Sequence, residues 1–245
     1  MKKSAINLFL LPGFMGQPND WQGIIKEANS IHIITTDLYE EGLPHPEEGL
    51  WAWADGFNRT VSKQHGSSKN IILGYSLGGR LAMHAFLKQP SLWQGAIFIS
   101  AHTGIQNDKE RSMRKLLDDD WAKRFLEDPW NDLMTAWNAQ SVFKNDKHTF
   151  TRTAEDYDRT LLADTLRHWS LANQNSLISL LEKIELPQLW VAGQDDHRFS
   201  AMAQQMQFVH PLSKTWIAPN TGHRVPWQSL DFANHVNTFI KEIFI

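Results

Sequence analysis

Cysteine is absent from the 245 residues of this sequence. Its absence excludes disulfide bonds, metal sites built on thiolates and enzymes that use a cysteine nucleophile. A strong excess of charge is absent as well, because 24 lysines and arginines stand against 27 aspartates and glutamates, for a net charge of −3. Such a balance gives no electrostatic basis for binding nucleic acid or an anionic membrane surface. We therefore expect no nucleic-acid partner.

Long apolar runs are also missing. No segment reaches the roughly 20 apolar residues that a transmembrane helix needs, so we expect no membrane partner. The apolar stretch at 6–11 stops at Pro12-Gly13 and has no small-residue cleavage pattern, which favours a first core strand over a signal peptide. From these features we expect a cytoplasmic protein. The sequence carries no signal of its oligomeric state.

Short apolar runs recur along the chain, and helix-length segments separate most of them. The runs are near-continuous rather than alternating, which is typical of parallel strands covered on both faces. The expected strands lie at 8–11, 31–35, 70–74, 96–100, 188–192 and 215–218. Helical stretches are expected between or after them, for example at 48–63, 80–88 and 226–244. This alternation predicts an α/β fold with a mostly parallel, doubly wound sheet.

The alternation breaks once. No strand pattern is visible from about 103 to 185, where helical periodicity and several tryptophans dominate. We interpret this interval as a helical cap inserted into the sheet domain. The predicted organisation is therefore a core at 1–102 and 186–245 and a cap at 103–185, within a length that suits one domain with an insertion.

The motif Gly74-x-Ser76-x-Gly78 stands between a predicted strand and a predicted helix. This is the arrangement of the nucleophile elbow in α/β-hydrolases, where a sharp turn exposes the serine hydroxyl. The glycines are needed because a side chain there would collide with the neighbouring strand or helix. The flanking strand and helix make a chance match improbable, so we predict an α/β-hydrolase fold with Ser76 as the nucleophile.

A serine nucleophile needs a base, and the base needs an acid that fixes its tautomer. In this fold the chain order is serine, acid, histidine. Asp195 and Asp196 follow the strand at 188–192, and His223 follows the strand at 215–218, at the edge where α/β sheets place their ligands. We predict the triad Ser76, Asp196 and His223. Asp196 is preferred because the usual pattern is Gly-x-x-Asp, and Asp195 stays the alternative.

An oxyanion hole needs two backbone N–H groups. We expect one from Leu77, which follows the serine, and one from Phe14 in the loop after the first strand. Tyr75 either packs along its strand or extends its hydroxyl to the pocket. A metal site is not expected, since the adjacent aspartates 118–120 diverge by about 100° each on a helix and the histidines lack ligand spacing.

The elbow and the cap together resemble one family, the 2-succinyl-6-hydroxy-2,4-cyclohexadiene-1-carboxylate synthases of menaquinone biosynthesis. The resemblance covers most of the chain and is most specific in the cap. The matching stretches are Gly-Tyr-Ser-Leu-Gly-Gly-Arg at 74–80, Ser-x-His-x-Gly-Ile-Gln-Asn at 100–107, Glu-Arg-x-x-Arg at 110–114, Asp-Trp-Ala-x-Arg-Phe at 120–125, Trp137 with Gln-Ser-Val-Phe at 140–143, and Leu-Arg-x-x-Ser at 166–170.

The resemblance implies a lyase built on a hydrolase fold. Such an enzyme abstracts a ring proton from 2-succinyl-5-enolpyruvyl-6-hydroxy-3-cyclohexene-1-carboxylate and eliminates pyruvate, with no cofactor. It also implies that Ser76, Asp196 and His223 are the triad and that a small polycarboxylate is the ligand. The implied substrate-binding residues are Tyr75, Arg80, Arg114, Trp137 and Arg167.

Chemistry agrees with arginine in this role, since its guanidinium offers carboxylates a rigid two-pronged donor. Arg80 lies in the first turn of the elbow helix, where a cation is disfavoured unless an anion is near. Arg111 shares a helix flank with Arg114 but matches no binding position, so we expect it to be solvated.

The chain departs from the family pattern at Pro12, at 39–42 and at 224–227, segments that surround the pocket entrance.

Two other functions are compatible with the same fold. A carboxylic ester hydrolase would use the same triad, but would not need the three arginines. A non-catalytic ligand-binding protein would not need an intact triad.

Overall fold

The computed structural model describes residues 6–25 and 31–245. Six strands form one sheet in the order β2-β1-β3-β4-β5-β6, and every neighbouring pair is parallel. The strands are β1 (Ile6–Leu11), β2 (Ile31–Thr35), β3 (Lys69–Tyr75), β4 (Gly95–Ile99), β5 (Gln188–Gly193) and β6 (Lys214–Ala218). Each predicted strand coincides with one of these within one or two residues at either end, so the predicted α/β fold is confirmed.

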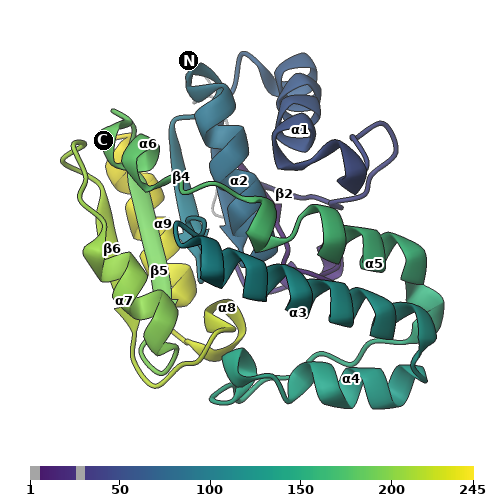
Figure 1. The fold of residues 1–245 in the computed structure, drawn as a ribbon. Helices are drawn as coiled ribbons and strands as arrows, with labels where there is room; N and C mark the ends of the chain where they lie inside the picture. Colours follow the sequence, from purple (N-terminus) through teal and green to yellow (C-terminus); the bar gives the residue numbers. More distant parts are fainter. Residues whose placement is uncertain (1–5, 26–30) are drawn as a thin grey trace.

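The helices cover both faces of this sheet (Figure 1). The α-helices are α1 (Leu50–His65), α2 (Leu77–Lys88), α3 (Asp108–Glu127), α4 (Trp130–Asn138), α5 (Arg159–His168), α6 (Ile178–Lys183), α7 (His197–Gln205), α8 (Val225–Gln228) and α9 (Phe232–Ile243). Short 3-10 helices are η1 (Pro18–Trp21), η2 (Pro46–Glu48), η3 (Pro90–Leu92), η4 (Ser141–Phe143), η5 (Ala154–Asp156) and η6 (Leu171–Asn173).

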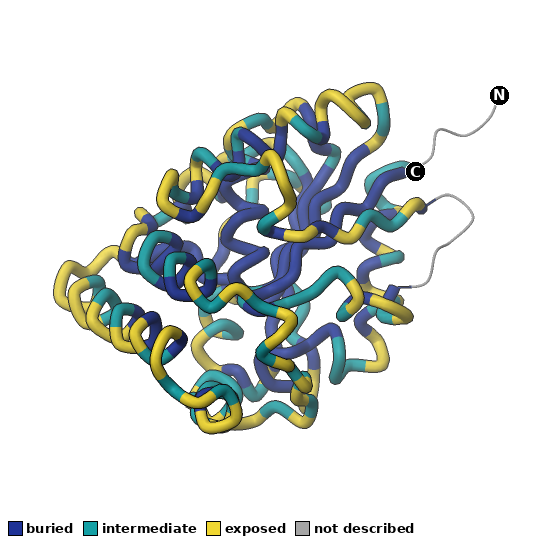
Figure 2. The backbone as a smooth tube through the Cα atoms, turned by 90° about the vertical axis from the view of Figure 1, so that its right-hand side faces the viewer, coloured by how far each residue is buried: buried dark blue, intermediate teal, exposed yellow. Residues whose placement is uncertain are grey.

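Side chains alternate between the two faces of each strand. Phe9 and Leu11 of β1 pack with α1 and α2 in one buried cluster, whereas Leu8 and Leu10 pack with α9 in another. The central strands of the sheet are therefore the buried centre of the molecule, and most exposed positions lie on the outer helices and loops, with a few on the edge strand β2 (Figure 2). Burial on both faces explains why the strands read as continuous apolar runs.

The single helix expected at 226–244 is wrong, because the chain forms α8 and α9 there with a turn between them. Ser229 closes α8 by donating its N–H to the carbonyl of Val225 and takes an extended conformation (φ −92°, ψ 121°). Phe232 then donates its N–H back to the carbonyl of Ser229. The turn leaves Leu230 98% exposed. This apolar residue fits the helical pattern of the sequence, although it lies in the turn and not in a helix.

Between β4 and β5 the described chain contains helices and loops but no strand. Helices α3, α4 and α5 share their own apolar cluster, which contains Trp121, Phe125 and Leu133. The later residues Trp169 and Leu181 instead pack in the cluster that covers the sheet. The division into a core and a cap at 103–185 stays a prediction, and the packing attaches the last part of that interval to the sheet.

Within the described residues, every helix is too short or too polar to cross a membrane.

Candidate active site

Ser76 occupies a strained turn between β3 and α2. Its φ of +52° lies in the left-handed region that side chains seldom adopt. Its N–H donates to the carbonyl of Ile99 at 2.9 Å, which anchors the turn to β4. A Cβ on Gly74 would collide with the carbonyl of Gly78, and a Cβ on Gly78 would collide with the carbonyl of Pro12. Both glycines are therefore required by close backbone approach, as the motif predicts.

Ser76, His223 and Asp196 form a hydrogen-bonded chain. The Nε2 atom of His223 lies 3.1 Å from Oγ of Ser76, and its Nδ1 atom lies 2.6 Å from Oδ2 of Asp196. Proton placement follows from the partners, because a carboxylate only accepts: Nδ1–H donates to Asp196, and Nε2 accepts from the serine. This arrangement suits a serine activated by a neutral imidazole.

The contacts of Asp195 are made by its backbone. Its backbone N–H donates to the carbonyl of Thr221, and its carbonyl accepts from the side chain of Asn145. Of the two aspartates after β5, Asp196 is therefore the one that contacts His223.

The histidine is held by more than the acid. Ser100 donates its hydroxyl to the carbonyl of His223 at 2.9 Å, which fixes the backbone of this loop. The rings of Tyr75, Phe143 and Phe199 surround the imidazole at centroid distances of 5.5, 5.8 and 4.8 Å. The Ser100 contact was not expected from the sequence, although the residue begins one of the matching stretches.

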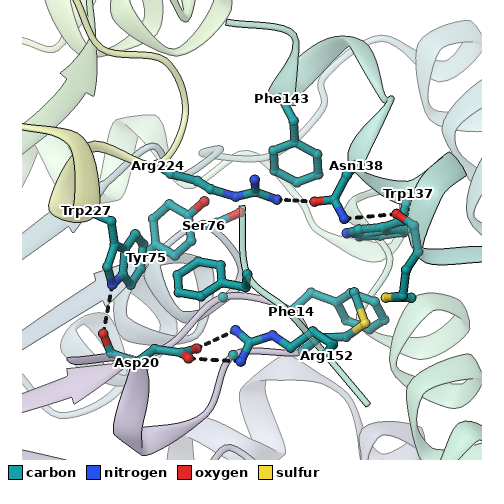
Figure 3. Close-up of a pocket in the computed structure, with 15 residues that line it drawn as sticks. Phe14, Asp20, Tyr75, Ser76, Trp137, Asn138, Phe143, Arg152, Arg224 and Trp227 are labelled. Carbon is teal, nitrogen blue, oxygen red and sulfur yellow. Dashed lines mark hydrogen bonds and ion pairs between the residues drawn. The ribbon is translucent and has the colours of Figure 1, made fainter. Parts of the chain in front are cut away.

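A cavity opens beside Ser76 (Figure 3). It contains three of the predicted site residues besides the serine, namely Phe14, Tyr75 and Trp137. Leu77 does not line it but begins α2, so its N–H lies in the first turn, where helical partners are absent. The lining residues are Gly13, Phe14, Met15, Gly16, Asp20, Tyr75, Ser76, Met134, Trp137, Asn138, Phe143, Phe150, Arg152, Arg224 and Trp227.

Three charged residues line this cavity, and none of them is among the site residues predicted from the sequence. Arg152 and Asp20 form a two-pronged ion pair, with Nη1–Oδ1 and Nη2–Oδ2 distances of 2.9 and 2.5 Å. Arg224 lies across the cavity from that pair (Figure 3). Arg224 and Trp227 belong to the segment that departs from the family pattern. That departure was the feature of the sequence that could have pointed to these two residues.

Burial raises the pKa of the Tyr75 phenol, and the nearby Arg224 only partly opposes this. The phenol therefore stays protonated at neutral pH and keeps a hydroxyl for donation. Its ring lies 4.9 Å from the ring of Trp227. Tyr75 therefore packs along its strand and also lines the cavity.

The structure does not bring the three predicted arginines to this cavity. Arg80 is buried, and its guanidinium donates to Oε1 of Gln174 and to the carbonyls of Trp169 and Ser170. Arg114 pairs with Asp118 at 2.8 Å, and Arg167 lies 3.5 Å from Asp164.

The expectation that Arg111 is solvated is wrong. Its guanidinium donates to the carbonyls of Ile105, Ala172 and Gln174, which belong to buried residues just before α3 and around η6. These buried carbonyls need donors, and spacing along α3 alone does not show that they are there.

The aspartates 118–120 diverge, as their spacing predicts. Asp118 contacts Arg114 and Ser170, whereas Asp119 contacts Lys115. Among residues 6–25 and 31–245, no three His, Asp or Glu side chains gather in a way that could hold a metal ion.

Comparison with known proteins identifies the family. Residues 6–230 match the model of the alpha/beta hydrolase fold. The chain is 30% identical to 2-succinyl-6-hydroxy-2,4-cyclohexadiene-1-carboxylate synthase of Salmonella arizonae over 226 residues, which cover 88% of this chain and 86% of that protein. It is 29% identical to the synthase of the same name from Serratia proteamaculans over 224 residues, with 88% and 85% covered.

A solved structure agrees with this match. MenH from S. aureus superposes with a TM-score of 0.87 at 23% identity, covering 98% of this chain and 95% of that one. This likeness concerns the fold, and the sequence identities above carry the finer assignment. The chain is therefore an enzyme with the α/β-hydrolase fold and belongs to the family of the 2-succinyl-6-hydroxy-2,4-cyclohexadiene-1-carboxylate synthases.

Proposed function

We propose that this enzyme eliminates pyruvate from 2-succinyl-5-enolpyruvyl-6-hydroxy-3-cyclohexene-1-carboxylate, giving 2-succinyl-6-hydroxy-2,4-cyclohexadiene-1-carboxylate. Family membership supports a role in menaquinone biosynthesis. The observation that carries the proposal is the chain of contacts from Asp196 through His223 to Ser76, whose hydroxyl opens into a cavity. A cytoplasmic location stays a prediction from the sequence.

In the proposed reaction Ser76 is the base. Its oxygen takes a proton from the ring carbon that carries the succinyl group, while its own proton passes to Nε2 of His223. The electrons of the broken C–H bond move through the ring double bond and expel the enolpyruvyl oxygen. The released enolate takes up a proton and becomes pyruvate. Asp196, hydrogen-bonded to Nδ1–H, stabilises the positive charge that His223 gains.

Negative charge develops on the succinyl carbonyl oxygen during proton removal. We assign the backbone N–H groups of Leu77 and Phe14 to this oxygen as an oxyanion hole. Leu77 contributes an N–H at the start of α2, where the helix dipole also favours negative charge. Phe14 lies on the loop after β1, and that loop lines the cavity beside Ser76.

The substrate carries three carboxylates, and the resemblance gives Arg80, Arg114 and Arg167 as candidate partners, although none of the three lines the cavity beside Ser76. The strongest support concerns Arg80, a buried cation whose three hydrogen bonds all go to neutral oxygens. Burial, together with the nearby charge of Arg114, lowers the pKa of Arg80 to about 9. A buried guanidinium in this position is better accommodated when an anion is near. Tyr75 and Trp137 contribute walls of the cavity.

Two measurements decide between this reaction and ester hydrolysis. Pyruvate release from the enolpyruvyl substrate is followed with lactate dehydrogenase, and nitrophenyl ester cleavage is followed by rapid mixing. The lyase gives pyruvate without a covalent intermediate and turns esters over weakly. A hydrolase gives a burst of nitrophenol, because an acyl-serine accumulates, and releases no pyruvate. The second result would replace the proposed function with ester hydrolysis. An absence of both activities would leave a binding protein.

A further inference from the structure

Arg224 is a buried cation at the cavity wall that the proposed mechanism does not use. It follows His223 directly in the chain, and its side chain is 7% exposed. Its guanidinium carbon lies 4.2 Å from the centroid of the Phe143 ring. Figure 3 shows it facing the Tyr75 hydroxyl on the same side of the cavity as Ser76. Because Arg224 lies beside the reacting serine, it can contact a ligand bound there.

The protein fixes Arg224 without using all its donors. Nη1 donates to the carbonyl of His148 at 2.7 Å, and Nη2 donates to Oδ1 of Asn138 at 2.8 Å. These bonds use two of the five N–H groups of a guanidinium. Asp146 is the counterion of Arg224, with Oδ2 3.6 Å from Nε, which is within ion-pair distance but beyond a good hydrogen bond. Three N–H groups remain beyond these two bonds, and the guanidinium also interacts with the Tyr75 side chain.

Arg152, the other cation that lines the cavity, differs from Arg224 because its partner is an acid of the same lining. Both Nη atoms of Arg152 bind the two oxygens of Asp20, so this pair is internally matched. Among the lining residues the charges of Asp20 and Arg152 cancel, which leaves the charge of Arg224, whose counterion Asp146 lies outside the lining. Aromatic walls from Tyr75, Phe143 and Trp227 keep the local dielectric low, which strengthens a charged hydrogen bond.

We propose that the Arg224 guanidinium and the Tyr75 hydroxyl form a carboxylate-binding site beside Ser76, which seats one anionic end of the substrate. The choice of substrate rests on the proposed function, whereas the site itself rests on the contacts of Arg224. Asn138 and Asp146 act as positioning residues. Asp146 accepts the backbone N–H of Arg224 at 3.1 Å and the Gln228 amide at 2.8 Å through Oδ1, which fixes the loop.

The test measures binding of succinate by titration calorimetry, with succinamide as the uncharged probe. Arg224→Gln removes the charge and is expected to weaken succinate binding by about 10- to 100-fold, which is the loss of one charge-assisted hydrogen bond. Arg224→Lys is expected to restore part of the affinity, since it keeps the charge and loses the planar fork. Arg59→Gln on α1, where the arginine is 68% exposed, is the matched control and should bind as the wild type does.

Asn138→Asp is the second variant, and it tests the site independently in case Arg224→Gln does not fold. It keeps the side-chain shape but places a negative charge on the atom that accepts from Arg224, so succinate affinity should fall by at least 10-fold. Thermal unfolding of every variant is measured in parallel. Wild-type succinate affinity in both Arg224→Gln and Asn138→Asp overturns the site, as does a wild-type protein that shows no saturable succinate binding.

Pyruvate release measured on the same proteins separates this inference from the proposed function. Loss of succinate binding in the variants, with no pyruvate formed by the wild type, keeps the site and removes the proposed reaction. Pyruvate formed by the wild type, with unchanged KM and succinate affinity in both variants, keeps the reaction and removes the site. A KM raised about 10-fold or more together with weaker succinate binding supports both.

Discussion

Arg80 donates its Nε–H to Oε1 of Gln174 at 2.6 Å, across 94 residues of sequence. The amide of Gln174 in turn donates to the carbonyl of His102 at 3.1 Å. These bonds connect the helix that follows Ser76 to the loop after η6 and to the chain that leaves β4. The first turn of the elbow helix and the segment between β4 and β5 are therefore one hydrogen-bonded unit.

Replacing Arg80 should destabilise the fold. Arg80→Leu removes the donors to Gln174, Trp169 and Ser170 and leaves buried acceptors unpaired. We expect a loss of about 2–4 kcal/mol in the free energy of unfolding, measured by urea titration. The exposed Arg59→Leu is the control and should change it by about 0.5 kcal/mol or less. Unchanged stability in Arg80→Leu, with only KM raised, would show that Arg80 serves ligand binding alone.

The two aspartates after β5 should differ in kinetics. Asp196→Asn removes the carboxylate that contacts Nδ1 of His223, so turnover should fall by orders of magnitude. Asp195 contacts its neighbours through its backbone, which Asp195→Asn leaves unchanged, so turnover should change little. The measurement is kcat for pyruvate release by both variants. A severe loss in Asp195→Asn with normal turnover in Asp196→Asn would reverse the assignment.

Stability should fall in mild acid, partly because of His84. Burial lowers its pKa from 6.5 to about 4, so the unfolded chain binds this proton more readily than the folded chain. The corresponding stability is complete above pH 6.5 and is lost as the pH falls towards 4, by about 3 kcal/mol. His84→Asn keeps a donor for the carbonyl of Arg80 and removes the titration.

The free energy of unfolding at pH 7 and pH 4.5 checks this prediction. The wild type should lose more stability between these values than His84→Asn does. His102 contributes in the same direction, because burial lowers its pKa to about 3, so the variant should keep part of the slope. Equal slopes for the two proteins would contradict the assignment to His84.

The sheet and the elbow were predictable because their signals are local. A strand buried on both faces must be apolar throughout, and Gly74 and Gly78 are fixed by backbone contacts that admit no Cβ. The turn between α8 and α9 was not predictable, since Leu230 keeps the apolar pattern while lying in solvent. Periodicity reports which residues are apolar, and the path of the chain decides which of them are buried.

The site was predictable where chain order fixes it. Ser76, Asp196 and His223 each follow a strand, and the parallel sheet brings those strand ends to one edge. The charges of the cavity were not predictable in the same way. Arg152 and Arg224 lie in loops whose positions depend on Asp20 and Asp146, and those contacts span 132 and 78 residues. Long-range pairing of this kind leaves no spacing pattern in one sequence.

Ser76 and His223 should act as one unit in the proposed pyruvate elimination. The most direct measurement is kcat for pyruvate release by the wild type, Ser76→Ala, His223→Ala and the double variant. Each single variant should lose orders of magnitude, and the double variant should be scarcely slower than either, because removing one member already disables the other. Losses that multiply in the double variant, or a Ser76→Ala protein that releases pyruvate at the wild-type rate, would contradict the account.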